Sequence, residues 1–143
     1  MKTLLTAFVL FLTNHAISQE VPFKFEINNL RNTDGSIIVS VYKEFKSFDD
    51  GLPEFRQTFS KIENIKDGTF HAQFLLPPGV YGLVFLDDEN NDEAMNNNLI
   101  GVPKEGFGFS NFYLSGFKKP KFSDFSFKHS EDTDTMEIRL RYL

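Results

Sequence analysis

Apolar and polar residues alternate along much of this chain, and a period of two is the pattern of β-strands with one buried face. The alternation is clearest in residues 23–28, 37–42, 70–76, 125–128 and 136–142. Residues 80–86 are apolar on both faces, which predicts a central strand buried on both sides. Two weaker stretches, residues 62–65 and 106–113, predict further short strands.

Segments rich in turn-forming residues separate these stretches. They are Asn32-Thr33-Asp34-Gly35, Lys66-Asp67-Gly68 and Pro77-Pro78-Gly79. Residues 43–59 predict a loop with one helical turn around residues 54–59, and no stretch longer than about ten residues has a helical apolar period. We therefore predict an all-β fold, a single Greek-key β-sandwich of roughly seven or eight strands with one long polar crossover loop from Asp87 to Lys104.

The first 18 residues have the pattern of a secretory signal peptide. Lys2 gives a positive start, residues 4–12 form an apolar core, and Ala16-Ile17-Ser18 supplies small residues for cleavage before Gln19. The apolar core is shorter than the about 20 residues that span a bilayer, and we expect no later membrane span. We expect a signal peptide at residues 1–18 and one β-sandwich domain at residues 19–143, exported to the periplasm or the extracellular space.

The net charge and the cysteine count limit the partners and the types of site that this protein can have. The chain has 15 Lys and Arg against 20 Asp and Glu, a net charge of −5 without a basic cluster. This balance argues against nucleic acid and against anionic membrane surfaces as partners. Zinc–thiolate, iron–sulfur and cysteine-nucleophile chemistry are excluded because the chain has no cysteine. A core rich in phenylalanine must therefore hold the domain together, with a metal ion as one further means of stabilisation.

The most distinctive chemistry lies in residues 87–98, which read DDENNDEAMNNN. Calcium takes about six to eight oxygen ligands, and loops supply them from alternate positions. Asp88, Asn90 and Asp92 match the first, third and fifth positions of an EF-hand-type loop, and Asn96 matches the ninth. These four residues are the candidate metal ligands, and calcium is the candidate ion.

Two positions depart from that pattern. Glu93 stands where a glycine eases the bend, and Leu99 stands where a bidentate glutamate closes the shell. Since no helical pattern flanks the loop, we expect an EF-like loop between two strands, with Asp87 or Glu105 completing the shell. We expect a weak site, with a Kd of about 10⁻⁴–10⁻³ M. The alternative is a solvated loop in which Asn and Asp side chains bond their own backbone.

Two segments resemble known families. Residues 74–85, FLLPPGVYGLVF, resemble the strand–turn–strand of transthyretin-like (prealbumin-like) and carboxypeptidase-regulatory-like sandwiches. Residues 88–111 resemble the signature of small exported bacterial proteins called domain of unknown function 2141, which runs Asp-x-Asn-x-Asn-Gly-x-x-Asp, then Gly-x-Pro-x-Glu and Gly-Phe-Ser-Asn. The residues that fill its positions here are Asp88, Asn90, Asp92, Asn96, Gly101, Pro103, Glu105, Gly108, Phe109, Ser110 and Asn111. The resemblance implies an exported transthyretin-like sandwich and no established activity.

Other chemistries find little support. His71 and His129 are far apart in the sequence, whereas a zinc site needs three or four clustered ligands. No Gly-x-Ser-x-Gly motif marks a serine nucleophile, so we assign no catalytic and no cofactor-binding residues. Eight aromatic residues between Phe107 and Phe127 are expected to pack in the core rather than to line a groove.

The leading interpretation is a non-enzymatic binding or accessory module of the cell envelope, stabilised by calcium through residues 87–98. Its partner would be an unidentified ligand or envelope protein. One alternative is an envelope enzyme that acts on carbohydrate or peptide with the loop carboxylates as acid and base. Another is a structural partner in an envelope complex, which would expose an apolar patch or a bare edge strand.

Overall fold

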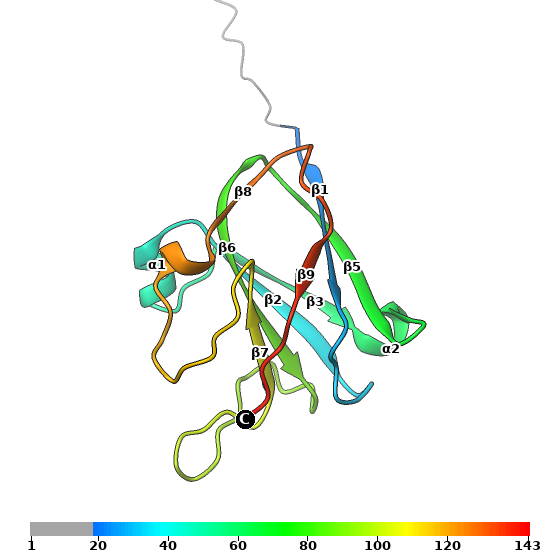
Figure 1. The fold of residues 1–143 in the computed structure, drawn as a ribbon, viewed down its shortest axis with the longest axis vertical. Helices are drawn as coiled ribbons and strands as arrows, with labels where there is room; N and C mark the ends of the chain where they lie inside the picture. Colours follow the sequence, from blue (N-terminus) through cyan, green and yellow to red (C-terminus); the bar gives the residue numbers. More distant parts are fainter. Residues whose placement is uncertain (1–18) are drawn as a thin grey trace, which may run out of the picture.

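The computed structural model describes residues 19–143, so the expected signal peptide lies outside the described residues. Within this part, the chain forms the strands β1 (Val21–Ile27), β2 (Ser36–Tyr42), β3 (Phe55–Ser60), β4 (Ile65–Lys66), β5 (Thr69–Leu76), β6 (Gly79–Asp88), β7 (Gly106–Phe109), β8 (Phe127–His129) and β9 (Met136–Ile138). The helices are short: α1 (Phe45–Asp49), α2 (Lys61–Asn64) and α3 (Phe122–Phe125). Figure 1 shows them at the periphery of the strands. The prediction of an all-β fold is confirmed.

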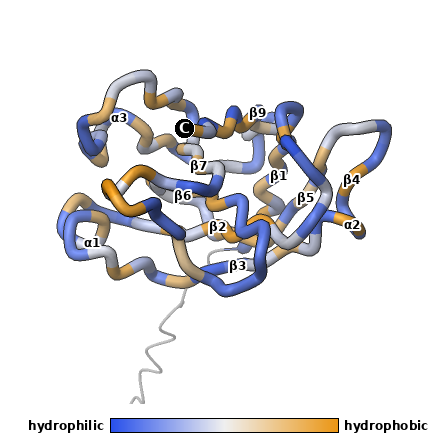
Figure 2. Tube along the Cα trace, turned by 90° about the horizontal axis from the view of Figure 1, so that it is seen from below, coloured by the Kyte–Doolittle hydropathy of each residue, from blue (hydrophilic) through white to orange (hydrophobic). Residues whose placement is uncertain are grey.

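The strands form two sheets. The four-stranded sheet has the order β4-β5-β1-β9, and the five-stranded sheet has the order β3-β2-β6-β7, with β8 also paired to β6. Most neighbours are antiparallel, but β9 runs parallel to β1. Figure 2 views the molecule end-on and places β1, β5 and β9 to one side of β2, β3 and β6. The two sheets therefore form separate layers.

The main core lies between these layers. Because successive side chains of a strand point to opposite faces, alternate apolar residues of each strand meet across the gap. The buried residues that meet there are Phe23, Phe25, Ile27, Ile37, Val39, Val41, Phe70, Leu76, Tyr81, Leu83, Phe85, Ile138 and Leu140. This cluster confirms the sequence prediction that a phenylalanine-rich core holds the domain together.

A second core covers the other face of the five-stranded sheet. It is formed by Tyr42, Phe48, Phe107, Phe109 and Phe125. Phe48 comes from α1 and Phe125 from α3, and these two helices lie next to each other beside β6 in Figure 1. With a core on each face, β6 is the central strand that the sequence predicts for residues 80–86.

Three details of the prediction are wrong. The described residues form nine strands rather than seven or eight, and the strand that the sequence pattern did not predict is β3. Residues 55–60 form β3 instead of a helical turn, because pairing with β2 overrides their weak local preference. Phe125 ends α3 and leaves only Phe127–His129 in a strand.

The fit of α3 against β6 depends on Gly82. A Cβ atom at this position would lie 2.5 Å from a ring carbon of Phe125 and 2.7 Å from one of Phe122. Phe125 is fully buried and has no room to withdraw. We predict that Gly82→Ala lowers the free energy of unfolding by about 1–3 kcal/mol, measured by urea denaturation. Gly116→Ala is the control, since no atom lies within 4 Å of its added Cβ, and an equal loss there would contradict the explanation.

Candidate metal-binding site

The candidate site lies in the loop between β6 and β7, residues 89–105, together with Asp88 at the end of β6. A bridge between Asn97 and Pro103 closes the outer part of this loop as a small hairpin. The remaining residues, 89–96 and 104–105, run side by side at its base, where the backbone N–H of Lys104 donates to the carbonyl of Asn96 at 2.7 Å. The base of the loop therefore brings the two ends of the predicted motif together.

Asp88 organises the first turn of the loop. Its carboxylate accepts the backbone N–H of Asp92 at 3.1 Å and that of Glu93 at 3.0 Å, one on each oxygen. The residue is only 1% exposed. The carboxylate thus curls the backbone around itself, as aspartate does in turns.

Asp92 lies across this turn and receives the two amides of the motif. Its Oδ2 accepts N–H groups of Asn96 at 2.7 Å and Asn90 at 3.0 Å, while Oδ1 accepts the backbone N–H of Ala94 at 3.0 Å. The bond from Asn96, followed by the backbone bond, lowers the pKa of Asp92 below its ordinary value. Asp92 is therefore an anion at neutral pH.

Glu105 reaches the same place from the other end of the loop. Its Oε1 accepts the backbone N–H of Glu89 at 3.1 Å, and its Oε2 accepts the backbone N–H of Asn96 at 3.1 Å. The side chain is buried, with 4% of the residue exposed. Glu105 therefore clamps the two strands of the loop base.

These contacts bring three carboxylates together. One oxygen from each of Asp88, Asp92 and Glu105 lies within 4.8 Å of the other two. Each carboxylate has about four lone-pair sites, so the backbone bonds leave lone pairs free for an ion. The hydrogen-bond network orients the side-chain amides of Asn90 and Asn96 with their N–H groups toward Asp92. Rotating each amide by 180° would point its oxygen toward the same place instead. The donor set is oxygen only, as calcium requires.

The backbone at Glu93 explains how the loop bends without glycine. Its φ angle is +61°, and that of Asn91 is +55°, both in the left-handed region. Glycine adopts this conformation without strain, whereas an exposed glutamate pays about 1–2 kcal/mol for it. Having Glu93 where the EF-hand pattern has glycine therefore lowers the stability of the loop but does not change its backbone path.

Asp87 does not join the cluster. As the preceding residue of β6, its side chain points to the opposite face, where Oδ1 lies 2.5 Å from Nζ of Lys61 and Oδ2 accepts the hydroxyl of Tyr142 at 2.7 Å. Burial raises the pKa of Asp87 above its ordinary value, against the opposing effect of Lys61 and Tyr142. Burial and the adjacent Asp87 also raise the pKa of Tyr142.

Arg31 ties the loop to the rest of the domain. Its guanidinium makes two bonds to the carboxylate of Glu89, at 2.6 and 2.8 Å, and one to the carbonyl of Lys104 at 2.6 Å. The bond from Arg31 lowers the pKa of Glu89. A shallow cavity of about 280 Å³ lies here, lined by Arg31, Glu89, Asn90, Asn96, Lys104 and Glu105.

Sequence reasoning missed Arg31, Glu89, Lys61 and Tyr142 as parts of this region. Arg31 and Glu89 are 58 positions apart, and Tyr142 and Asp87 are 55 apart. The local pattern of an ionic residue carries no information about so distant a partner. The sequence around Lys61 also gives no sign that this residue is fully buried.

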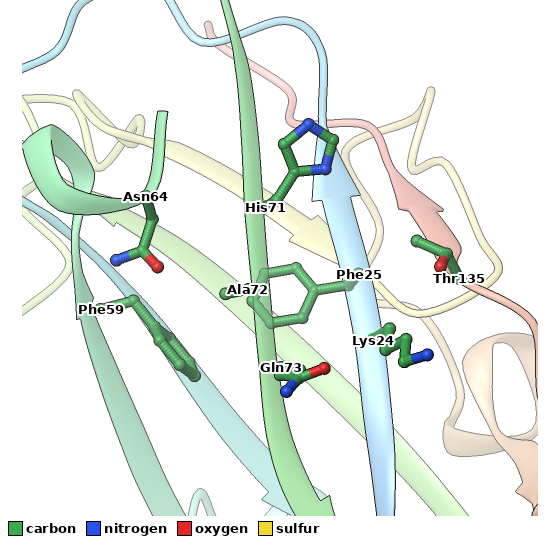
Figure 3. Close-up of a pocket in the computed structure, with 8 residues that line it drawn as sticks. All are labelled: Lys24, Phe25, Phe59, Asn64, His71, Ala72, Gln73 and Thr135. Atoms are coloured by element: carbon green, nitrogen blue, oxygen red, sulfur yellow. The ribbon is translucent and has the colours of Figure 1, made fainter. Parts of the chain in front are cut away.

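Another cavity lies along β1 and β5, away from the loop (Figure 3). It measures about 390 Å³ and is lined by Lys24, Phe25, Phe59, Asn64, His71, Ala72, Gln73 and Thr135. Its histidine pairs with Glu26, with Nδ1 3.6 Å from Oε2. The lining is polar at the rim and aromatic at Phe25 and Phe59, which is ordinary for the gap between two sheets.

The aromatic run between Phe107 and Phe127 follows the sequence prediction only in part. Phe107, Phe109 and Phe125 are buried in the second core. Only Tyr113 and Phe117 are well exposed, at 41% and 87%. Most of these rings therefore pack in a core, but Phe107, Phe109 and Phe117 also line a cavity of about 330 Å³, which the sequence prediction did not include.

The chain matches one known protein family. Residues 25–137 match the family described as "Uncharacterized protein conserved in bacteria (DUF2141)", so the chain belongs to this family. No curated protein and no solved structure matches it. Among the described residues, no helix is long and apolar enough to cross a membrane. The resemblance seen in residues 88–111 is confirmed at the level of the family.

The left-handed conformation at residue 93 gives a direct test of the loop. We predict that Glu93→Gly raises the free energy of unfolding by about 0.5–1 kcal/mol, because glycine removes the strain of the positive φ angle. Glu63→Gly in α2, where φ is not positive, is the control and should lower it by a similar amount. Chemical denaturation of both variants measures the difference. A loss of stability in Glu93→Gly would show that the loop does not hold this conformation.

Proposed function

We propose that this protein is an exported, non-enzymatic binding or accessory module of the cell envelope, stabilised by a calcium ion in the β6–β7 loop. The observation that carries the proposal is the meeting of Asp88, Asp92 and Glu105, with one oxygen of each within 4.8 Å of the others. Three anions so close repel one another, and a dication would neutralise them. Asn90 and Asn96 would add oxygens from the same loop.

The proposal includes export and a transthyretin-like arrangement of the sandwich. Export, to the periplasm or the exterior, rests on the signal-peptide pattern of residues 1–18. The absence of cysteine gives an exported domain reason to use another stabilising device. An ion that joins residue 88 at the end of β6 to residue 105 before β7 would brace a long loop against the five-stranded sheet.

The carboxylates have less support as an acid–base pair. A general acid at neutral pH needs a raised pKa, whereas Arg31 lowers that of Glu89 and Asn96 lowers that of Asp92. The chemistry of the loop therefore favours binding a cation over proton transfer.

A calcium titration tests the proposal. We predict that about 10 mM calcium raises the thermal midpoint above that in chelator, because a ligand of the folded state stabilises it by up to about 2.7 kcal/mol at a 100-fold excess over Kd. Asp92→Asn should abolish the rise, and as Asp92 is exposed, the variant is expected to fold. Asp67→Asn, in the turn between β4 and β5, is the matched control and should keep it. An unchanged midpoint in the unaltered protein would leave the loop a solvated connector.

A second candidate function is attachment to an envelope partner. Leu99 and Ile100 project from the tip of the loop hairpin, with relative exposures of 106% and 83%. A photoreactive residue in place of Ile100 should cross-link a partner in intact cells. Cross-links that form equally at the exposed Leu52 would remove the case for this tip.

A further inference from the structure

Lys61 has an environment that the metal site does not explain. Its side chain is fully buried at the start of α2, a rare position for a lysine. Its Nζ lies 2.5 Å from Oδ1 of Asp87, 2.9 Å from Oδ1 of Asn32 and 3.4 Å from the backbone carbonyl of Asn32. A buried amine is thus held against both a carboxylate and a side-chain amide.

The amide of Asn32 is polarised for attack. Its Oδ1 accepts from Nζ of Lys61 and also from the backbone N–H of Asp34 at 3.1 Å. The backbone N–H of Asp34 remains on this oxygen when Nζ attacks, and it stabilises the negative charge that develops there. The same two donors fix which end of the amide faces the lysine.

Asp87 has the position of a proton carrier. Its Oδ1 makes no hydrogen bond of acceptable geometry among the described residues, although Nζ of Lys61 is only 2.5 Å away. Tyr142 holds the other oxygen and fixes the carboxylate in place.

We propose that Lys61 and Asn32 join in a spontaneous amide cross-link, with Asp87 carrying the protons. Asp87 takes one proton from the ammonium, and the neutral amine attacks Cγ of Asn32 to form a carbon–nitrogen bond. Asp87 gives that proton to Nδ2 and takes a second from the attacking nitrogen. The Cγ–Nδ2 bond then breaks, neutral ammonia leaves, and Asp87 keeps the second proton as a neutral carboxyl group.

The site favours this reaction for two physical reasons. Groups held in contact react with effective concentrations of about 10⁵–10⁸ M when they are well oriented. The product also replaces a buried ion pair with a neutral amide and a neutral carboxyl group, and burying charges is costly even when they are paired. Neither reason depends on calcium, so the test of the cross-link is independent of the test of the proposed metal site.

The cross-link would join distant parts of the chain. Asn32 follows β1, and Lys61 follows β3, with 29 positions between the two residue numbers. Closing such a loop restricts the unfolded chain, as a disulfide does. The protein, which has no cysteine, would gain a covalent brace that reducing conditions do not break.

Mass spectrometry of the intact and digested protein tests the proposal. The expected protein is lighter than its sequence by one ammonia. Trypsin should release a branched peptide in which residues 32–43 are joined to residues 57–66, because the modified Lys61 is no longer cleaved. An N-terminal glutamine also loses ammonia when it cyclises, so the branched peptide and not the mass alone decides.

Variants assign the three roles. Lys61→Arg, Asn32→Ala and Asp87→Asn should each lack the branched peptide, whereas the exposed Lys66→Arg should retain the same link, with its cleavage sites unchanged. The unaltered protein decides the matter even if a variant fails to fold. Linear peptides alone from that protein would overturn the proposal. A loss of water with a branch from Lys61 to Asp87 would overturn the role of Asn32.

Discussion

The structure depends on burying β6 on both faces while its last two residues are acidic. Because neighbouring side chains of a strand point to opposite sides, Asp87 and Asp88 cannot share an environment. Asp87 meets Lys61, Asn32 is close by, and Tyr142 completes that side. Asp88 instead curls the following loop around its carboxylate. A single strand thus sets up both the buried ionic cluster and the metal-binding candidate.

The two clusters differ in what holds them. The loop carboxylates are bound mainly by backbone N–H groups within residues 88–105, so their arrangement is local. The cluster around Asp87 draws its members from segments far apart in the chain and needs the whole sandwich to assemble. Loss of the loop ligands should therefore weaken one loop, whereas loss of the buried cluster should weaken the domain.

This difference also explains what the sequence could predict. Period-two patterns located β1, β2 and β5, and a run apolar on both faces located β6. The spacing of oxygen side chains selected Asp88, Asn90, Asp92 and Asn96, with Asp87 or Glu105 to complete the shell. In the structure, Asp88, Asp92 and Glu105 each place one oxygen within 4.8 Å of the other two. The edge strand β3 was missed because it depends on its pairing with β2. The partners of Asp87 were missed because they are set by tertiary packing, which a local pattern does not encode.

The hairpin at the outer end of the β6–β7 loop has a consequence for variation. This hairpin is held by contacts within itself. Asn97 and Pro103 form a β-bridge, and the side chain of Asn98 accepts the backbone N–H groups of Ile100 and Val102. The turn has no share in the carboxylate contacts. Residues 99–101 should therefore accept an inserted peptide or epitope without disturbing the acidic base, since exposed turns of this kind tolerate insertion.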